Sequence, residues 1–394
     1  MTHRVAIVGA GPAGFYAADG LLRANPDLHI DIIDRLPTPY GLVRAGVAPD
    51  HQGTKAVVRQ FERLLAQPDV RFAGNVEVGR DLSWDELGEA YDAVIVATGM
   101  VVDRRLGVPG EDLPHVWGSW RFVAWLNGHP DFRAAPDLSA VRSVAVIGNG
   151  NVALDVARLL AKSADEMAKS DIVPEAGASI AAAPITDIHV IGRRGPEHAS
   201  FTNNELAEIG RLARAVAVTE AATLDVVPPA TDPTPERLRK AKNLEILKGF
   251  SANKAGAKPV TVHFVFDAAP TAIRPHEVEC ATRTLPADLV VTCIGYTGQE
   301  FPKGEHIFPV GWARRGPTGT IPTNRADSHA VAKEVLAWLG QRDPKSGPDI
   351  LPVAVDAAGW HRIDKHEVAS GAAAGRPREK LVEWQALLEV AQSG

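Results

Sequence analysis

Two stretches of the chain repeat one order of apolar and polar positions. Residues 4–34 contain an apolar run, a glycine-rich turn, a helical segment and a second apolar run, and residues 143–191 repeat this order. Apolar runs that alternate with helical segments are typical of parallel strands joined by helices. The pattern predicts two strand–turn–helix–strand units in an α/β protein.

Further periodic segments extend this prediction. Residues 55–66 place apolar side chains on one helical face. Ser83 and Glu86 have the spacing of a capping box, which marks a helix start, and residues 91–98 are typical of a buried strand. We expect the Ala-rich segment 164–184 to be a surface insertion. Strands are expected at 260–266 and 288–293, and helices near 327–339 and 378–390.

Composition and charge exclude several classes of protein. Hydrophobic residues make up 45% of the chain, which is ordinary for a packed protein and excludes a disordered or collagen-like one. The net charge of −6 disfavours a general affinity for nucleic acid or for anionic membranes. No stretch approaches the roughly 18 apolar residues that a membrane helix needs, and no signal peptide is recognisable at the start. We therefore expect a cytoplasmic protein.

The cysteine content restricts the redox chemistry. Cys280 and Cys293 are the two cysteines of the sequence, and they are too far apart for a CxxC motif. We therefore expect neither a disulfide scaffold nor an iron–sulfur cluster held by cysteines. No other spacing suggests a metal-ligand cluster, so no metal site is predicted.

The first glycine-rich turn has the spacing of a dinucleotide-binding fingerprint. Gly9 permits a tight turn, Gly11 lets a pyrophosphate approach the backbone, and Gly14 allows close packing of helix on strand. The helix start adds partial positive charge toward the phosphates. Asp34 ends the next strand, where its carboxylate can accept hydrogen bonds from ribose hydroxyls. An incidental glycine turn is the alternative interpretation.

The second turn repeats the fingerprint with Gly148, Gly150 and Ala153. The strand that follows ends without a carboxylate, and Arg193 and Arg194 come directly after it. Two guanidinium groups there can hold a 2′-phosphate in forked geometry. This difference favours NADP(H) over NAD(H) at the second site, and a solvated basic turn is the alternative interpretation.

Two dinucleotide sites, one with an acid and one with arginines, indicate one retained cofactor and one exchanging cofactor. Hydride transfer between a nicotinamide and a flavin is the chemistry that this pairing favours. A disulfide reductase would need a redox cysteine pair, which the sequence does not supply. A flavin-dependent NADPH monooxygenase would couple NADPH oxidation to an organic substrate, and a non-enzymatic flavin redox sensor would bind FAD without oxidising NADPH.

Four motifs lie at residues 36–51, 148–155, 192–196 and 311–319. In this order they resemble the motifs of the adrenodoxin reductase family of ferredoxin–NADP(+) reductases, and the first is the most specific. The resemblance implies that NADPH passes a hydride to FAD and that reduced FAD passes single electrons to a ferredoxin-type iron–sulfur protein.

The resemblance also implies cofactor contacts, residue by residue. Those to FAD, besides Gly9, Gly11 and Gly14 of the turn, are Ala13, Asp34, Leu42, Val78, Trp312, Gly319, Thr320 and Ile321. Those to NADP, besides Gly148, are Asn149, Gly150, Asn151, Val152, Arg193, Arg194 and Glu205, with Gly319 near both cofactors. The implied pair near the site of hydride transfer is His51 and Glu208. A loop histidine that caps backbone and a solvated helix carboxylate are the alternatives for these two residues.

The motif at 311–319 suggests how the protein acts on the flavin. Trp312 by itself is more typical of a core residue, but a Gly-Pro-Thr-Gly turn follows it, before a helix whose N-cap we expect to be Asn324. A helix start aimed at the flavin pyrimidine would stabilise the anionic reduced ring. The resemblance supplies the location of this helix start.

We therefore expect an α/β protein with two Rossmann-like dinucleotide-binding domains, the NADP domain being inserted in a discontinuous FAD domain. The expected boundaries are 1–105 and 296–394 for the FAD domain and 106–295 for the NADP domain. Segments 267–285 and 296–311 are shorter than in the family, which affects substrate docking more than cofactor binding.

Ferredoxins are generally acidic, so a reductase with a net charge of −6 needs a local basic surface to attract one. Arg237, Arg239 and Lys240 form the densest basic cluster, just after the proline-rich loop 228–235. We expect ferredoxin to dock near this cluster. A solvated helix face without a partner is the alternative.

Overall fold

The computed structural model describes residues 2–393, which form two compact units. The first unit contains the chain up to residue 102, the loop 127–131 and the chain from residue 296 onward. The second unit contains residues 103–126 and 132–295. Short strands mark the two main crossings between the units, β5 (Val102–Asp103) and β15 (Tyr296–Thr297).

The loop 127–131 belongs to the first unit, although it lies within the segment that the sequence assigns to the inserted domain. The side-chain oxygen of Asn127 accepts hydrogen bonds from the ammonium groups of Lys55 (2.9 Å) and Lys380 (2.8 Å). All three side chains are buried. Two buried lysines therefore hold the loop in the first unit, and both are far from it in sequence.

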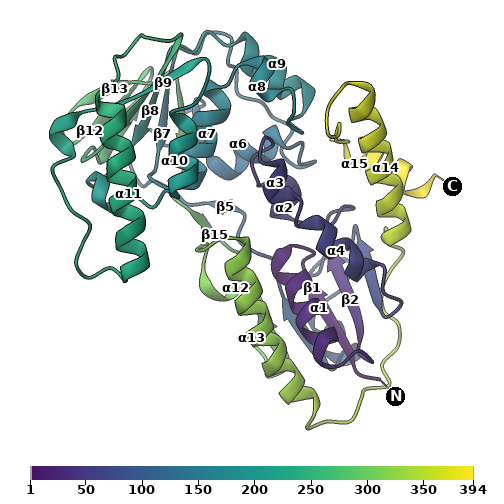
Figure 1. Ribbon diagram of the computed structural model, residues 1–394. Coiled ribbons are helices and arrows are strands. Elements are labelled where there is room, and N and C mark those ends of the chain that lie inside the picture. Colours follow the sequence, from purple (N-terminus) through teal and green to yellow (C-terminus); the bar gives the residue numbers. More distant parts are fainter. Residues whose placement is uncertain (1, 394) are drawn as a thin grey trace. The chain divides into compact units, whose positions relative to one another are not determined.

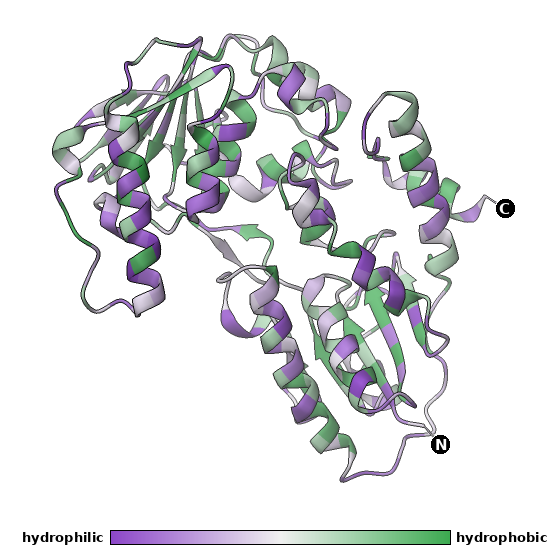
Figure 2. Ribbon diagram, in the orientation of Figure 1, coloured by the Kyte–Doolittle hydropathy of each residue, from purple (hydrophilic) through white to green (hydrophobic). Residues whose placement is uncertain are grey.

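Among residues 2–393, the first unit contains a parallel five-stranded sheet with the order β16-β4-β1-β2-β3. In Figure 2 these strands are mainly hydrophobic, as expected for a parallel sheet that is covered on both faces. The strands are β1 (Arg4–Val8), β2 (His29–Asp34), β3 (Val70–Gly74), β4 (Ala93–Val96) and β16 (Ile307–Pro309).

Helices pack on both faces of this sheet. On one face α1 (Pro12–Ala24) and α13 (Ile321–Leu339) lie side by side (Figure 1) and share a buried apolar cluster with Ile7 and Ile30 of the strands. On the other face α5 (Trp84–Ala90) packs on Ala6 and its neighbours. The remaining helices are α2 (Leu42–Ala45), α3 (Gln52–Lys55), α4 (Val58–Leu65), α12 (Trp312–Arg315), α14 (Ala357–Ala373) and α15 (Trp384–Gln392).

Within the described chain, the second unit contains a parallel six-stranded sheet with the order β6-β14-β7-β8-β10-β9. Its strands are β6 (Val116–Gly118), β7 (Ser143–Ile147), β8 (Asp187–Ile191), β9 (Ala215–Thr219), β10 (Val260–Val265) and β14 (Leu289–Thr292). A small antiparallel sheet consists of β11 (Pro270–Arg274), β12 (Glu277–Cys280) and β13 (Thr284–Pro286).

The helices of the second unit follow its strands in the order expected for a doubly wound sheet. They are α6 (Ser119–Leu126), α7 (Asn151–Ala161), α8 (Ala164–Met167), α9 (Pro174–Ala182), α10 (Asn203–Ile209) and α11 (Thr234–Ser251), with 3₁₀ turns at Pro196–His198 and Ala221–Thr223. The predicted fold class, two Rossmann-like dinucleotide-binding units in an α/β protein, is confirmed.

Three local predictions need correction. The segment 164–184 is not a bare surface insertion, because it forms α8 and α9 and buries Ile172 and Ile180. Asn324 lies inside α13, whose N-cap is Thr320. The C-terminal region contains α14, which the sequence patterns missed, and α15 begins six residues later than the helix expected from residue 378. The predicted capping box at Ser83 and Glu86 is present at the start of α5.

Candidate functional site

The first glycine-rich turn joins β1 to α1, and its three glycines differ in what surrounds them. A side chain on Gly9 (φ +111°) would place a Cβ atom 2.5 Å from the Ala97 carbonyl oxygen, and a Cβ on Gly14 would overlap the Gly9 carbonyl oxygen. For Gly11, no atom of the described residues lies within 4 Å of the Cβ position. The first and third glycines are therefore required by packing, whereas the second faces open space.

Asp34 organises this turn as well as facing it. Its Oδ2 atom accepts a hydrogen bond from the Ala10 amide (2.7 Å), and its Oδ1 atom accepts one from the Leu36 amide (2.9 Å). Burial raises the pKa of Asp34, and the two amide hydrogen bonds oppose that rise. A carboxylate oxygen can accept more than one hydrogen bond, so Asp34 keeps acceptor capacity for a ribose hydroxyl.

The signature loop lies directly on the glycine-rich turn. The Tyr40 amide donates a hydrogen bond to the Ala10 carbonyl oxygen (2.7 Å), and a Cβ on Gly41 would be 3.1 Å from the Gly11 Cα atom. Leu42 begins α2 immediately afterwards and is half-buried. The loop therefore brings the backbone of residues 40–42 beside Gly11, while the side of Gly11 where a Cβ would lie stays open.

The other two candidates from the N-terminal part of the chain lie at loop positions. His51, at the end of the signature loop, is half-buried and is the N-cap residue of α3. Val78 follows β3, forms an isolated bridge with Leu82 and packs beside the apolar cluster under α5. Both residues are half-buried, so part of each side chain is exposed.

The second motif of the first unit also reaches the glycine-rich turn. A Cβ on Gly311 would lie 2.6 Å from the Ala13 Cβ atom, and Ser328 of α13 donates a hydrogen bond to the Ala13 carbonyl oxygen (3.0 Å). Trp312 stacks on Tyr296 with a ring separation of 5.9 Å. These contacts place Gly311, just before α12, and Ser328, inside α13, beside the start of α1.

The turn before α13 is open to solvent. Gly319 and Thr320 are exposed and Ile321 is half-buried. The Thr320 amide donates a hydrogen bond to the Thr323 hydroxyl (3.1 Å), which satisfies one backbone group at this helix end. Asn324 instead accepts a hydrogen bond from Arg315 (2.7 Å). A helix thus begins after this turn, as expected, but its N-cap is Thr320, four residues before the expected Asn324.

The second glycine-rich turn joins β7 to α7 in the second unit. Gly148 has φ +149°, and a Cβ there would overlap the Cys293 carbonyl oxygen. Gly150 is the N-cap of α7, and a Cβ there would have the Ser200 hydroxyl oxygen at 3.3 Å. The Oδ1 atom of Asn149 is buried and accepts no hydrogen bond from residues 2–393. Asn149 therefore presents an unsatisfied acceptor at the position predicted to contact a nucleotide.

The basic residues after β8 are free of internal partners. Arg193 and Arg194 are both exposed, and neither forms an ion pair within residues 2–393. Several other arginines of this unit have carboxylate partners, for example Arg283 with Glu220. Two unpaired guanidinium groups at the end of a central parallel strand are available to an anionic ligand.

The candidate carboxylates Glu205 and Glu208 lie on α10 and are held by α7. The guanidinium of Arg158, which is fully buried, lies 3.0 Å from Glu205 and 3.6 Å from Glu208, and the Lys162 ammonium lies 3.2 Å from Glu208. The Thr202 amide donates a hydrogen bond to Asn151 Oδ1 (2.8 Å), which joins the start of α10 to the glycine-rich turn. Glu208 is thus not a merely solvated helix carboxylate.

Sequence reasoning missed Arg158, although a signal for it exists. Asp155 and Arg158 are charged residues three apart in an otherwise apolar helix, and they form an ion pair of 2.8 Å. Such a pair inside an apolar segment indicates buried electrostatic partners on a neighbouring element. The partners themselves lie about 50 residues later and have no pattern of their own.

The proposed docking cluster needs correction. Lys240 is buried and forms ion pairs with Asp232 (2.6 Å) and Glu236 (3.3 Å). Arg239 is half-buried and donates a hydrogen bond to the Phe201 carbonyl oxygen. Arg237 is exposed. Two of the three charges therefore hold α11 in place, and one is available at the surface.

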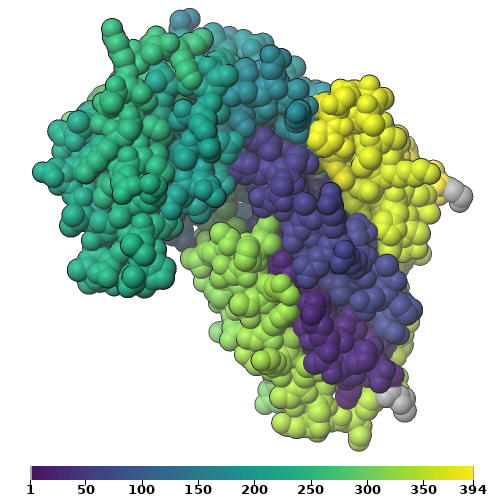
Figure 3. Space-filling model, in the orientation of Figure 1, coloured from purple at the N-terminus to yellow at the C-terminus, as the bar shows by residue number. Residues whose placement is uncertain are grey.

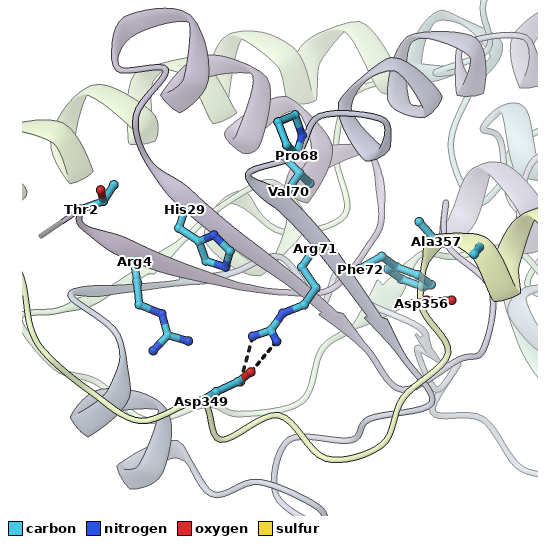
Figure 4. A pocket seen from close by; sticks show the side chains of 11 residues that line it. Thr2, Arg4, His29, Pro68, Val70, Arg71, Phe72, Asp349, Asp356 and Ala357 are labelled. Atoms are coloured by element: carbon cyan, nitrogen blue, oxygen red, sulfur yellow. Dashed lines mark hydrogen bonds and ion pairs between the residues drawn. The ribbon is translucent and has the colours of Figure 1, made fainter.

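A groove of about 700 Å³ lies in the first unit, beside the starts of strands β1, β2 and β3. Figure 4 shows Arg71 pointing to Asp349 across this groove, and the two ion-pair distances of Arg71 to Asp349 and Asp31 are both 2.7 Å. Arg4 donates hydrogen bonds to the Gly347 and Pro348 carbonyl oxygens (3.1 Å each). The arginines of the groove thus fasten the segment before α14. Ligands of parallel sheets bind at the opposite, carboxyl ends of the strands.

Comparisons with known proteins agree with this geometry. The model of the pyridine nucleotide-disulphide oxidoreductase family matches residues 3–183. NADPH-ferredoxin reductase FprA of Mycobacterium tuberculosis is 37% identical over 462 aligned positions, which cover 98% of this chain and 99% of that protein. The mitochondrial NADPH:adrenodoxin oxidoreductase of Arabidopsis thaliana is 33% identical, with 98% and 95% covered. A structure of Mycobacterium tuberculosis FprA in complex with NADPH superposes with a TM-score of 0.93 at 35% identity, and the match covers 100% of both chains.

The fold and the two turns define a dinucleotide-dependent flavoprotein oxidoreductase. Within this class, the chain belongs to the adrenodoxin reductase-like family of ferredoxin–NADP(+) reductases. The alignment with FprA spans 462 positions and the chain has 394 residues, so it lacks several segments of that relative. Among residues 2–393, no helix combines the length and the apolar character needed to cross a membrane.

The two glycines of the second turn should respond differently to alanine. Gly148→Ala forces a Cβ onto backbone at a left-handed φ, so we expect it to lower the free energy of unfolding by about 1–3 kcal/mol, measured by urea denaturation. Gly150→Ala meets only a hydroxyl and should change stability by less than about 0.5 kcal/mol. It should nevertheless weaken NADP(+) binding in calorimetry, because the Cβ blocks close approach of the pyrophosphate. Unchanged NADP(+) affinity in Gly150→Ala would contradict a nucleotide at this turn.

Proposed function

We propose that this protein oxidises NADPH by hydride transfer to FAD and delivers the electrons singly to a ferredoxin-type iron–sulfur protein. The observation that carries the proposal is the contrast between the two dinucleotide turns. Asp34 at the first turn is half-buried and already accepts hydrogen bonds from two amides, as suits a cofactor that stays in place. Arg193 and Arg194 at the second turn are exposed and unpaired among the described residues, as suits a phosphorylated substrate that exchanges.

The residues of the first unit fit FAD. Gly11 faces open space, Asp34 retains acceptor capacity, and the exposed turn at Gly319 and Thr320 precedes the start of α13. Bound there, FAD supplies the exchange between a two-electron donor and a one-electron acceptor. The dipole of α13 places partial positive charge at its start, which would favour the reduced, anionic ring over the oxidised one. Leu42, Val78, Trp312 and Ile321 are the further FAD contacts that we propose.

The residues of the second unit fit NADP(H). Asn149, Gly150, Asn151 and Val152 start α7, where backbone amides and the helix dipole favour a pyrophosphate. Arg193 and Arg194 bind the 2′-phosphate, and Glu205 contacts the nucleotide from α10. The ion pairs with Arg158 fix the position of Glu205 before the nucleotide arrives.

We assign His51 and Glu208 to the site of hydride transfer. The Lys162 and Arg158 contacts hold the Glu208 carboxylate in one orientation. His51 ends a loop whose backbone lies on the glycine-rich turn. A disulfide reductase is not supported, because Cys293 is buried, Cys280 is half-buried and both are free thiols. A monooxygenase or a flavin sensor has no observation in its favour.

The function is tested by reducing the purified protein anaerobically. It should be yellow from bound FAD, NADPH should bleach the flavin absorbance, and added ferredoxin should restore it. His51→Gln and Glu208→Gln should slow bleaching in stopped flow without releasing FAD, whereas Glu245→Gln, which alters an exposed helix carboxylate, should not. Colourless protein that FAD cannot reconstitute would refute the function, and wild-type rates in both variants would refute only the two residue assignments.

The arginine pair determines nucleotide selectivity in this proposal. Arg193→Ala and Arg194→Ala should each weaken NADPH by roughly ten- to a hundred-fold, since a charge-assisted hydrogen bond contributes about 1.5–3 kcal/mol. NADH lacks the 2′-phosphate, so its KM should change little. Arg211→Ala, at an exposed arginine of the same unit, is the matched control. Equal losses for NADPH and NADH would contradict the assignment.

We propose that ferredoxin docks on the exposed face of α11. Arg237 and Lys248 are exposed on this helix. Leu238, next to Arg237, has 67% of its surface exposed and adds an apolar side chain that a partner can contact. Arg239 and Lys240 support this face through their internal contacts. An acidic partner is drawn to the free charges, and this attraction weakens with salt.

Arg237→Gln should therefore raise the apparent KM for ferredoxin and flatten its dependence on ionic strength. Reduction of ferricyanide by NADPH should not change, because this small acceptor needs no docking surface. Lys169→Gln removes an exposed charge elsewhere in the second unit and serves as the control. Ferredoxin kinetics that stay at wild-type values at every salt concentration would show that the partner docks elsewhere.

A further inference from the structure

Tyr40 adopts a backbone conformation that its side chain disfavours. Its φ is +82°, although it is neither glycine nor asparagine, and only 3% of its surface is exposed. A bulky residue at positive φ costs roughly 1–3 kcal/mol and persists only where the surroundings enforce it. Such conformations concentrate at functional sites, so what enforces this one is informative.

The hydroxyl of Tyr40 is anchored by a carboxylate on another helix. It donates a hydrogen bond to Glu62 of α4, which also accepts hydrogen bonds from Trp360 Nε1 (3.0 Å) and from His361 Nε2 (2.9 Å) of α14. Burial raises the pKa of Glu62, but these hydrogen bonds outweigh it and leave the pKa below its ordinary value. Glu62 is therefore an ionised, multiply bonded anchor, and Figure 3 shows α14 adjoining the segment that carries it.

Aromatic packing restricts the Tyr40 ring as well. The ring lies 5.5 Å from Phe15 of α1 and 5.5 Å from Trp360, the latter edge-on at 87°. Trp360 and Phe15 are themselves almost completely buried. These contacts hold the side chain in one position, and in that position the backbone of Tyr40 has a positive φ.

The strained backbone lies directly against the first glycine-rich turn. The Tyr40 amide binds the Ala10 carbonyl oxygen, and Gly41 approaches Gly11 closely. Gly11 is the glycine whose Cβ position is open space among the described residues. Relaxation of Tyr40 to negative φ would move this peptide away from Ala10 and Gly11.

We propose that Tyr40 and Glu62 are positioning residues for FAD: the anchored hydroxyl holds the strained peptide of residues 40–41 against the glycine-rich turn and so preforms the flavin pyrophosphate site. This inference rests on the proposed function, since it assumes that FAD occupies the first turn. It adds that the retention of FAD depends on a hydrogen bond on the far side of the Tyr40 ring, supplied by α4 and completed by α14.

Tyr91 provides a matched comparison. Its hydroxyl donates a hydrogen bond to the buried carboxylate of Asp31 (2.6 Å), and it is buried in the same unit. Its φ is −116°, which is unstrained, and it lies at the end of α5. Tyr91→Phe therefore removes the same kind of bond without touching the glycine-rich turn.

The experiment compares FAD release from purified holoprotein by the rise in flavin fluorescence after dilution, with the melting temperature measured alongside. Tyr40→Phe keeps the ring and loses the anchor, so FAD release should accelerate about ten-fold or more, as for loss of a hydrogen bond to a charged group. Glu62→Gln keeps an uncharged acceptor and should give an intermediate rate. Tyr91→Phe should lower the melting temperature comparably but release FAD at the wild-type rate. The flavin absorbance bands should shift in Tyr40→Phe alone of the two tyrosine variants.

Each outcome decides between the two roles. If Tyr40→Phe and Tyr91→Phe release FAD equally fast, the Tyr40 hydroxyl serves stability only and the inference is wrong. If Tyr40→Phe does not fold, a wild-type release rate and spectrum in Glu62→Gln overturns it. Wild-type protein that holds no FAD would refute the proposed function instead, so the two failures are distinguishable.

Discussion

Direct contact of backbone with backbone at the end of β1 is the constraint on which the first unit depends. A Cβ on residue 14 would overlap the Gly9 carbonyl oxygen. Because Gly14 has no Cβ, α1 can begin directly against the strand. This places Ala13 where Gly311 and the Ser328 hydroxyl of α13 can reach it. Two segments separated by about 300 residues therefore meet at one turn, and their close approach depends on the glycines at positions 9, 14 and 311.

The sequence was most informative where the chemistry is local. Glycine spacing located both turns, and the apolar run of β8 located Arg193 and Arg194 directly after a strand, where both are exposed. It failed where the partner of a side chain lies far along the chain. Lys240 carries the same charge as Arg237, three residues earlier. It is nevertheless buried and forms ion pairs with Asp232 and Glu236. Arg158, the positive φ of Tyr40 and the helix α14 likewise depend on tertiary contacts, which no local pattern encodes. The roles of the individual site residues stay predictions.

The two turns share one backbone plan and differ in how their polar groups are satisfied. At the first turn Asp34 is half-buried, and the protein itself supplies two hydrogen-bond donors to its carboxylate. At the second turn the buried Asn149 oxygen and the exposed arginines have no internal partner among the described residues. A site whose polar groups already have hydrogen-bond partners in the protein loses few hydrogen bonds when its ligand leaves. A site with unsatisfied polar groups gains hydrogen bonds each time a ligand binds. The same fold can thus keep one nucleotide and exchange another.

The discontinuity of the first unit has a consequence for biosynthesis. Its sheet receives β16 beside β4 only when residues 307–309 have been made, and Glu62 receives its donors from α14 only when residues 360 and 361 have been made. The whole inserted unit, by contrast, is complete by residue 295. Domains generally fold as units in the order of their synthesis. On the ribosome the inserted unit therefore acquires its full sequence first, and the parallel sheet of the first unit stays unfinished, with a strand edge exposed to aggregation, until the last hundred residues emerge.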